Sequence, residues 1–508
     1  MTDATITKNP LLIGKGLPPF NEIEAGQVVP AMTQLLKELS AEIAKLEANV
    51  TPTWSGLVEP LTAIDERLGW SWGIVGHLMS VKNSPQLREA YQQMQPEVIK
   101  FYTKLTQSKP LYEAFKGIRE GAEWNKLEPA QKRIVESSLR DFELSGVGLE
   151  GETKERFNQI QLESGELSTN FSNNVLDATK AFKLRLTDKK DIEGLPPSAL
   201  GLMAQTAKAQ GDEDATPENG PWVVTLDYPS YIPYMKYATN RELREKLYKA
   251  FVSRAADGEF DNRGNIDRIL KLRKEKANIL GFANFAELSL AKKMATDVAA
   301  VQNLQEELRV ASYDAAIREF EELKAFAGQD DLKNWDTSYW AEKQREAKFN
   351  FNEEELRPYF SLPKVLDGLF GLANRIFDVT ITAADGKAPV WHDDVRYFKI
   401  ADETGKAISF FYLDPYSRPA EIQGGAWMID CIGRAKMTVD GKTETRLPVA
   451  YLTCNQTPPV DDKPSLMTFG EVTTLFHEFG HGLQHMLTTI DYAEAAGINN
   501  VEWDAVEL

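Results

Sequence analysis

The hydrophobic pattern of the chain changes its period near Val379, and this change limits the folds that the sequence can adopt. From Val28 to that point, apolar residues recur mainly at three- and four-residue steps, which is the spacing of amphipathic helices. After that point, apolar and polar residues alternate in short runs that are separated by turn signals, as in half-buried strands. The sequence therefore predicts a mainly α-helical protein with one small antiparallel sheet of about four strands.

The strand candidates are the runs 390–400, 407–413, 424–430 and 447–454. The third run starts with Gly424-Gly425-Ala426, whose small side chains would let a peptide backbone come close to the strand. An extended substrate that adds to such a sheet edge gains main-chain hydrogen bonds with little side-chain selectivity. Bulge glycines without any ligand are the alternative interpretation, and the sequence does not choose between the two.

Composition excludes several classes of function. The formal charge of the 508 residues is −18 and no basic stripe offsets it, which argues against nucleic acid as a partner. The two cysteines exclude a disulfide framework and fit a reducing compartment. The first twenty residues lack the features of a signal peptide, and no run of eighteen apolar residues occurs. We therefore expect a cytoplasmic monomer that binds neither nucleic acid nor a membrane.

The length of the chain predicts two or more domains. We expect an N-terminal helical region over 1–150 and a second helical region over 151–379. The predicted sheet and the helix that follows it form the third region, 380–508.

The strongest chemical signal is His477-Glu478-Phe-Gly-His481, which follows the last predicted strand. Thr468 begins a capping-box pattern and apolar residues continue at helical steps, so a helix is predicted over about 469–487. Residues four apart lie on one helix face, and both imidazoles can therefore bind one ion while Glu478 reaches its water. The pattern predicts one Zn²⁺ per chain and hydrolysis of an amide bond.

A catalytic zinc ion needs a third protein ligand, and its spacing separates the classes of zinc peptidase. The ligand positions of two such classes are occupied here by residues that cannot serve, Leu487 in one case and Asn500 or Val501 in the other. The acidic candidates that remain are Glu494, Glu502, Asp504 and Glu507.

A helix over 501–508 with Asn500 as its N-cap would turn Glu507 to the face opposite Glu502, and this favours Glu507 without excluding the others. Asp504 would then either orient a ligand or be a first-turn acid favoured by the helix dipole. His485 lies roughly 12 Å beyond His477 along the helix axis, too far to share the ion, and is predicted to pack or to support the ligands.

At these residues the chain resembles the thimet-oligopeptidase family of zinc metallopeptidases. The resemblance rests on His477-Glu-Phe-Gly-His481 and on Glu507, which follows after 25 intervening residues in Trp-Asp-Ala-Val-Glu-Leu. It extends from the arm at 17–20 to the last residue and includes the stretches 81–91, 140–146, 173–179, 411–414 and 448–455.

The resemblance implies a zincin-like, neurolysin-type fold, in which a two-lobed helical shell surrounds a deep narrow channel with zinc at its floor. It implies that His477, His481 and Glu507 hold the zinc and that Glu478 is the general base. It further implies that short, unstructured oligopeptides enter the channel and are cleaved with broad specificity, whereas folded proteins are excluded.

Members of the family carry a Gly-rich loop with Tyr and His residues beyond the third ligand, where it binds substrate and the oxyanion. No such loop follows Glu507 here. We therefore expect that the chain is a fragment without the remainder of the catalytic domain, and that its hydrolytic activity is impaired.

Three functions remain open at this point. The first is a zinc endopeptidase of oligopeptides, and the second is a dipeptidyl carboxypeptidase of the same family. The third is a non-catalytic fragment that binds peptides. The intact Glu478 favours an enzyme, because a binding scaffold has no need of a base beside the metal.

Overall fold

The computed structural model describes residues 9–439, 442–460 and 464–507, and the structural statements below refer to these residues. Helices dominate the fold, as predicted. The α-helices are α2 (Val28–Asn49), α3 (Glu59–Val81), α4 (Pro85–Thr106), α5 (Lys109–Glu120), α6 (Pro129–Leu144), α7 (Gly151–Ala181), α8 (Pro197–Ala209), α9 (Tyr228–Tyr237), α10 (Arg241–Val252), α11 (Arg263–Ile279), α12 (Phe285–Leu290), α13 (Val298–Ala327), α14 (Asn334–Phe349), α15 (Leu362–Phe377) and α16 (Phe469–Met486).

The strands are β1 (Leu184–Leu186), β2 (Trp222–Val224), β3 (Thr380–Ala383), β4 (Arg396–Ala401), β5 (Ala407–Tyr416), β6 (Trp427–Ile432), β7 (Ala435–Val439), β8 (Lys442–Arg446) and β9 (Val449–Gln456). Two two-stranded sheets are formed by β1 with β2 and by β7 with β8. The main sheet has five strands in the order β3-β4-β5-β9-β6, so that β3 and β6 are its edges.

The main sheet differs from the prediction in its size and in one pairing. Strands β5 and β9 are parallel, whereas the other neighbouring pairs are antiparallel. The expectation of a purely antiparallel sheet was therefore wrong. A parallel pair needs a long connection, and here residues 417–448 supply it. Alternation of apolar residues records the face of a strand but not its direction, so the sequence pattern could not distinguish the two cases.

Two hydrophobic clusters cover the two faces of the main sheet. Phe411 and Leu452 point to one face and pack with α15 and α16. Tyr412 and Tyr451, their neighbours in sequence, point to the other face and pack with α2, α3 and α4. Central strands that are buried on both faces become apolar almost throughout, and β9 is buried along nearly its whole length.

Helix α16 is fixed to the sheet at its start and along its face. The predicted capping box is present, because Thr468 and Glu471 exchange hydrogen bonds at the first turn. The Glu471 carboxylate also accepts hydrogen bonds from the backbone and hydroxyl of Thr457, just after β9. The absence of a side chain at Gly482 lets α16 approach the sheet closely, because a Cβ there would lie 3.1 Å from Leu452 Cδ2.

A buried aromatic cluster joins the N-terminal helices to the main sheet. The His77 ring stacks on Tyr451 at a centroid distance of 3.9 Å and meets Trp391 edge-on at 4.3 Å. Phe20, from the N-terminal arm, contacts both His77 and Trp391. The arm and α3 therefore share one core with the sheet.

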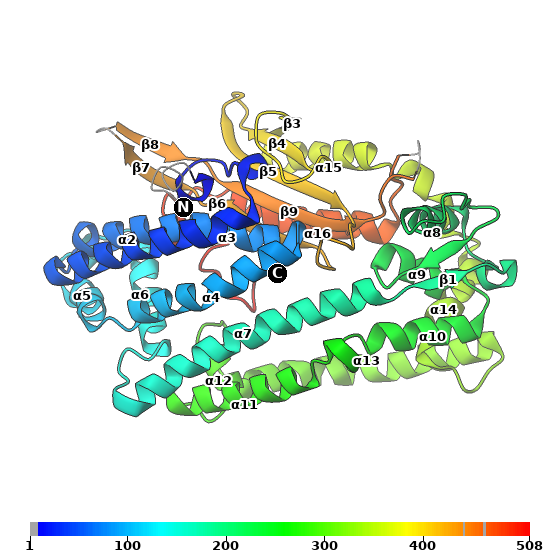
Figure 1. The fold of residues 1–508 in the computed structure, drawn as a ribbon, viewed down its shortest axis with the longest axis horizontal. Helices are drawn as coiled ribbons and strands as arrows, with labels where there is room; N and C mark the ends of the chain where they lie inside the picture. The colour runs from blue at the N-terminus through cyan, green and yellow to red at the C-terminus, as the bar shows by residue number, and fades with distance from the viewer. Residues whose placement is uncertain (1–8, 440–441, 461–463, 508) are drawn as a thin grey trace.

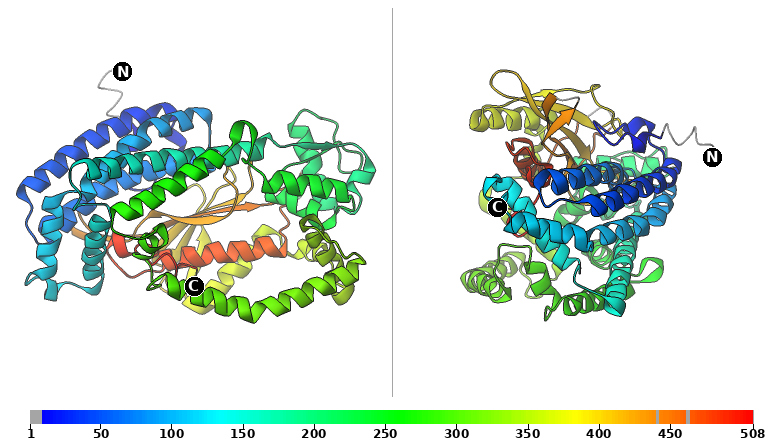
Figure 2. Two further views of the ribbon diagram at one scale, coloured as in Figure 1. Left: turned by 90° about the horizontal axis from the view of Figure 1, so that it is seen from below. Right: turned by 90° about the vertical axis from the view of Figure 1, so that its left-hand side faces the viewer.

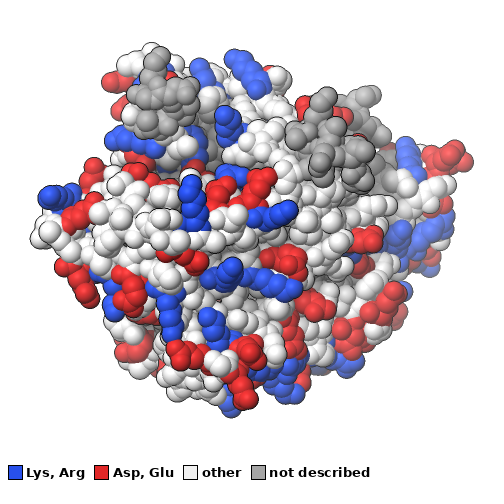
Figure 3. Space-filling view, turned by 60° about the vertical axis from the view of Figure 1, so that its left-hand side comes forward, with Lys and Arg blue, Asp and Glu red and all other residues white. Residues whose placement is uncertain are grey.

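Figure 1 shows α2 to α6 at one end of the molecule and α8 to α10 at the other, with the long helix α7 between them. The main sheet and α16 lie on one side of α7, and α11 and α13 lie on the other. Seen from below in Figure 2, the described end of the chain returns to α16. On the face drawn in Figure 3, Lys and Arg side chains are interspersed with Asp and Glu. No helix of the described residues combines the length and the apolar character that a membrane span requires.

Candidate metal centre

Three predicted ligands converge on one point beside α16. The Nε2 atoms of His477 and His481 lie 3.2 Å apart. Glu507 Oε2 lies 3.0 Å from Nε2 of His477 and 3.4 Å from Nε2 of His481. Among the described residues this is a group of His and Glu ligand atoms with the spacing of a metal site.

These separations fit a tetrahedral zinc ion. Imidazole nitrogen and carboxylate oxygen bind zinc at about 2.0–2.2 Å, so two ligand atoms of a tetrahedral site lie about 3.4 Å apart. The side chains of His477 and Glu507 are 50% and 67% exposed, whereas that of His481 is 14% exposed. The centre is thus open on one side, as a catalytic zinc site must be to admit water and substrate.

Glu478 is buried beside this centre, with 6% of its surface exposed. Burial raises the pKa of the Glu478 carboxyl, and the neighbouring His477 and His481 act in the opposite direction. A carboxylate with a raised pKa accepts and returns a proton more readily near neutral pH than an exposed one does.

The segment that carries Glu507 is not the predicted helix. Residues 503–507 form turns, and Leu508 lies outside the described residues. Asn500 is not an N-cap, because its φ of +62° is left-handed and its side chain donates to Ser137 Oγ in α6. Tertiary contacts fix this segment in place of helical hydrogen bonds.

Two of the other acidic candidates are engaged elsewhere. Glu494 accepts a hydrogen bond from the Thr62 hydroxyl. Glu502 pairs with Arg133 at 2.7 Å, and the same guanidinium donates to the Asn500 carbonyl. These contacts anchor the segment before Glu507 to α3 and α6.

Asp504 has neither of its predicted roles. Its carboxylate accepts hydrogen bonds of 2.9 Å from the backbone amides of Met294 and Ala295, and these bonds lower the pKa of the carboxyl. It therefore ties the segment to the turn before α13, and among the described residues it forms no hydrogen bond with His477, His481 or Glu507. Residues 503–507 form turns in place of the predicted helix, so Asp504 is not a first-turn acid of that helix.

His485 packs behind the centre. It is fully buried, and its Nε2 lies 3.0 Å from the Ile432 carbonyl of β6. Gly497 packs against it with a φ of +64°, and a Cβ there would lie 2.6 Å from His485 Cα. His485 thus supports the point at which the chain turns back towards the ligands.

Gly424, Gly425 and Ala426 form a loop before β6, so the prediction that a strand begins there was wrong. Gly425 has a φ of +101°, a conformation that favours glycine. The Asn455 amide donates to the carbonyls of Gln423 and Gly425 and thereby fixes the loop. Strand β6 begins at Trp427 and is an edge of the sheet, so an edge is present directly after the glycines.

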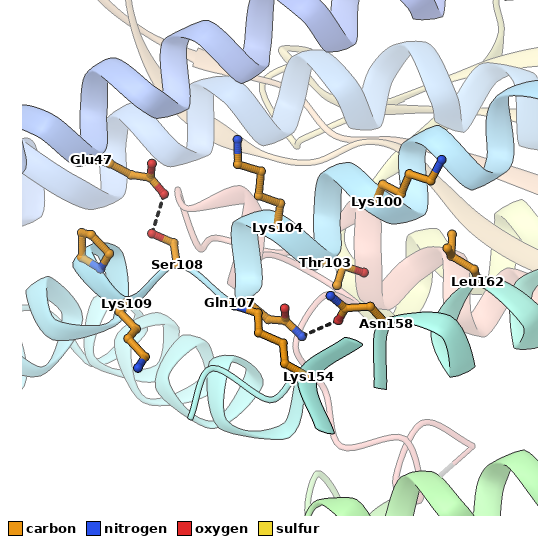
Figure 4. A pocket seen from close by; sticks show the side chains of 11 residues that line it. Glu47, Lys100, Thr103, Lys104, Gln107, Ser108, Lys109, Lys154, Asn158 and Leu162 are labelled. Carbon is orange, nitrogen blue, oxygen red and sulfur yellow. Dashed lines mark hydrogen bonds between the residues drawn. The ribbon is translucent and has the colours of Figure 1, made fainter. Parts of the chain in front are cut away.

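Two cavities lie outside the metal centre. One, of about 470 Å³, lies between α4, α5 and the start of α7 and has four lysines among its lining residues. Figure 4 shows that Lys104 and Lys109 extend in opposite directions, so the amino groups do not converge on one ligand. The other, of about 300 Å³, lies between α7 and the Gly424-Gly425 loop.

The residues that position Glu507 could not be found from the sequence. Arg133 and Asn500 are more than 360 residues apart in the chain. Neither belongs to a motif, and a hydrogen bond between such distant segments leaves no local signal in the sequence.

Two family models and several known proteins match the chain over most of its length. The family model described as Peptidase family M3 matches residues 234–508, and that of the Neurolysin/Thimet oligopeptidase N-terminal domain matches residues 32–154. Organellar oligopeptidase A, chloroplastic/mitochondrial, of Arabidopsis thaliana is 54% identical over 514 residues, covering 100% of this chain and 65% of that protein.

Oligopeptidase A of Escherichia coli (strain K12) is 44% identical over 511 residues, covering 98% of this chain and 73% of that protein. Oligopeptidase A of Haemophilus influenzae (strain ATCC 51907 / DSM 11121 / KW20 / Rd) is 43% identical over 509 residues with the same coverage. The chain thus spans between 65% and 73% of the length of these relatives. The resemblance predicted from the motifs is confirmed, and the chain belongs to peptidase family M3.

Proposed function

We propose that this chain carries the zinc centre of an endopeptidase that hydrolyses short, unstructured oligopeptides. The observation that carries the proposal is the convergence of His477, His481 and Glu507 on one point, with the buried Glu478 beside it. Relatives named oligopeptidase A support a peptide substrate.

The residues of the chain divide the chemistry among them. His477, His481 and Glu507 would hold one Zn²⁺, which supplies a Lewis acid for the scissile carbonyl and acidifies a water. Glu478 takes the proton of the attacking water and passes it to the leaving amine. The open edge of β6 pairs with the substrate backbone, so binding depends little on side-chain identity.

The proposal includes the setting of this centre. A two-lobed shell with a narrow channel would admit short peptides and exclude folded proteins, and the regions 1–150, 151–379 and 380–508 would build it. We further propose a monomer that acts in the cytoplasm and has no nucleic acid partner. The even mixture of charges on the face in Figure 3 supports the last point.

A Glu478→Gln variant tests the role of the base. The amide keeps the shape of the side chain but cannot accept the proton, so peptide hydrolysis should fall at least about a hundredfold. Zinc content, measured by atomic absorption, should stay at one ion per chain. Glu403→Gln, an exposed residue in the turn after β4, is the matched control and should retain full activity.

Two results would contradict the proposal. Unchanged turnover in Glu478→Gln would exclude this residue as the base. Peptide binding with no hydrolysis by the zinc-loaded parent chain would favour the non-catalytic alternative. Mass spectrometry of the products separates an endopeptidase, which cuts internally, from a dipeptidyl carboxypeptidase, which releases C-terminal dipeptides.

A further inference from the structure

The cavity of about 300 Å³ beside the Gly424-Gly425 loop has features of a substrate subsite. Its walls come from α7, from the start of α9 and from the loop that leads into β6. The side chains of Thr179, Arg254 and Asn455 contribute polar atoms to its lining. A Cβ at Gly424 or Gly425 would meet no atom within 4 Å, so these two lining residues have open space beside them.

The cavity adjoins the loop that leads into β6, the edge strand that lies beside the helix α16 with its two predicted histidine ligands. Met428 of β6 pairs with Leu452 of β9, and Leu452 packs against Gly482, the residue after the ligand His481. Gly425 precedes Met428 by three residues, a span of at most about 10 Å. An extended peptide that added to β6 opposite Met428 would therefore reach the cavity about three residues further on.

The direction of the peptide follows from the pairing. Antiparallel addition, the commoner kind, makes the substrate run opposite to β6. Its C-terminal side then lies towards the beginning of β6, which is the side of the cavity.

Arg254 supplies a positive charge to this cavity without a carboxylate partner. No Asp or Glu of the described residues lies within ion-pair distance of its guanidinium, although many other arginines of the chain form such pairs. Partial burial lowers the pKa of the Arg254 side chain, and the neighbouring Tyr228 and Tyr231 act in the opposite direction. A half-buried and unpaired guanidinium gains free energy when an anion binds to it.

Arg254 is also held in one orientation. Its Nε donates to the Phe251 carbonyl at 2.9 Å, and its guanidinium lies 3.9 Å from the centre of the Phe251 ring. Nη1 lies 3.4 Å from the Thr179 hydroxyl, and Nη2 has no hydrogen-bond partner among the described residues. The acidic residue of the lining, Asp227, accepts a hydrogen bond from Thr225 and is not an ion-pair partner of Arg254.

We propose that Arg254 binds a carboxylate on the C-terminal side of the peptide substrate, about three residues beyond the cleaved bond. This inference rests on the proposed peptidase function. The carboxylate is either the C-terminus of a short peptide or the side chain of an Asp or Glu at that position. In the first case, the subsite selects peptides by the distance from the cut to their end.

Direct binding tests the inference without dependence on turnover. Calorimetry measures the Kd of the zinc-loaded Glu478→Gln protein for three N-acetylated peptides, which share one neutral sequence except at the last residue of the third. The first has a free C-terminus three residues beyond the bond that the parent chain cleaves, as mapped by mass spectrometry. The second is amidated there, and the third is amidated with Glu as its last residue.

We expect the first or the third peptide to bind at least about tenfold more tightly than the second, as a charge-assisted hydrogen bond predicts. Preference for the first identifies the C-terminus as the source of the carboxylate, and preference for the third identifies a side chain. Adding Arg254→Gln should remove the preference and leave the affinity for the amide unchanged. Arg254→Lys should keep part of the preference for a carboxylate, because the positive charge remains but the planar guanidinium fork is lost.

Arg263→Gln is the matched control, since this exposed arginine pairs with Asp261 at the start of α11, and it should keep the full preference. Equal affinity for all three peptides overturns the inference but leaves the peptidase proposal intact. The inference is also overturned if Arg254→Gln loses the same affinity for the carboxylate peptides as for the amidated neutral peptide while its circular dichroism is unchanged. The role of Arg254 would then be structural. If the parent chain neither binds nor cleaves any peptide, the proposed function fails as well.

Discussion

At the scale of single residues, the environment of His77 shows how packing changes the chemistry of a side chain. Its ring is enclosed by aromatic rings, and neither ring nitrogen has a hydrogen-bond partner among the described residues. Burial lowers the pKa of His77 to about 3, because the charged form would lose its hydration without gaining a partner. His77 therefore packs in the core as an uncharged ring.

Acid should destabilise the protein through this residue. Below pH 6.5 the unfolded chain binds a proton at His77 and the folded chain does not, so stability falls as the pH decreases towards 3. The loss is about 1.4 kcal/mol per pH unit in this window. Through His77, the free energy of unfolding of the parent should fall by about 1.4 kcal/mol between pH 6 and pH 5. His77→Phe should lack this contribution. Urea titration of both proteins at the two pH values measures the difference. Identical pH dependence in both proteins would contradict this account.

Gly497 packs against His485 ten residues before Glu507, the predicted third ligand. In Gly497→Ala the new Cβ would meet the backbone of His485 and the left-handed φ would be strained, so the segment that carries Glu507 must shift. We expect zinc affinity, measured by competition with a chelating dye, to fall about tenfold or more. Gly258→Ala is the control, because Gly258 has a similar φ of +66° but open space around it. This variant introduces the backbone strain without a clash of the kind that Gly497→Ala makes with His485. Equal zinc affinity in the two variants would show that the contact with His485 does not matter.

At the scale of elements, the first turn of α16 fixes the helix to the end of β9. Glu471 has two structural roles. It completes the capping box of α16, and it accepts two hydrogen bonds from Thr457 at the end of β9. Glu471→Ala should therefore cost about 2–3 kcal/mol of stability, whereas Thr468→Ala should cost about 1 kcal/mol. Thr473→Ala, on the exposed face of the same helix, should have little effect. Urea titration measures all three, and equal costs for Glu471→Ala and Thr468→Ala would contradict the double role.

Elements that depend on short-range pattern were predictable, and those that depend on distant contacts were not. Helix α16 was found almost to the residue, because its cap and its apolar spacing lie within the helix itself. The parallel pairing of β5 with β9 was missed, because strand direction leaves no trace in alternation. The helix predicted over 501–508 failed for a related reason, since propensity was outweighed by hydrogen bonds to Arg133, Ser137 and the 294–295 backbone.

The candidate centre divides in the same way. The spacing of His477, Glu478 and His481 is set by one helix and could be predicted from its geometry. Glu507 was favoured among several acids and indicated by a family resemblance, but its placement depends on anchors that lie far away in the chain. Asp504 was misinterpreted because its partners, the amides of Met294 and Ala295, have no side-chain identity that a sequence could reveal.

At the scale of the whole molecule, the candidate metal centre depends on four parts of the chain that are distant in sequence. The two histidines lie on α16, and the segment that carries Glu507 is held by α3, α6 and the turn before α13. An ion that binds only the folded state stabilises it by about 2.7 kcal/mol at a free concentration of 100 times Kd. Removal of zinc with a chelator should therefore lower the Tm of the chain in calorimetry. His477→Ala should show no such shift, and an equal shift in both proteins would contradict a stabilising site at this position.

The connection between β5 and β9 has a consequence for how such enzymes diversify. Residues 417–448 leave the sheet after one central strand and return to it at the next, and they carry both the Gly424-Gly425 loop and the edge strand β6. The predicted metal ligands and the two central strands all lie outside this segment. Mutations within it can therefore change which peptides are preferred without disturbing the hydrolytic machinery, so selectivity and chemistry can evolve, or be engineered, separately.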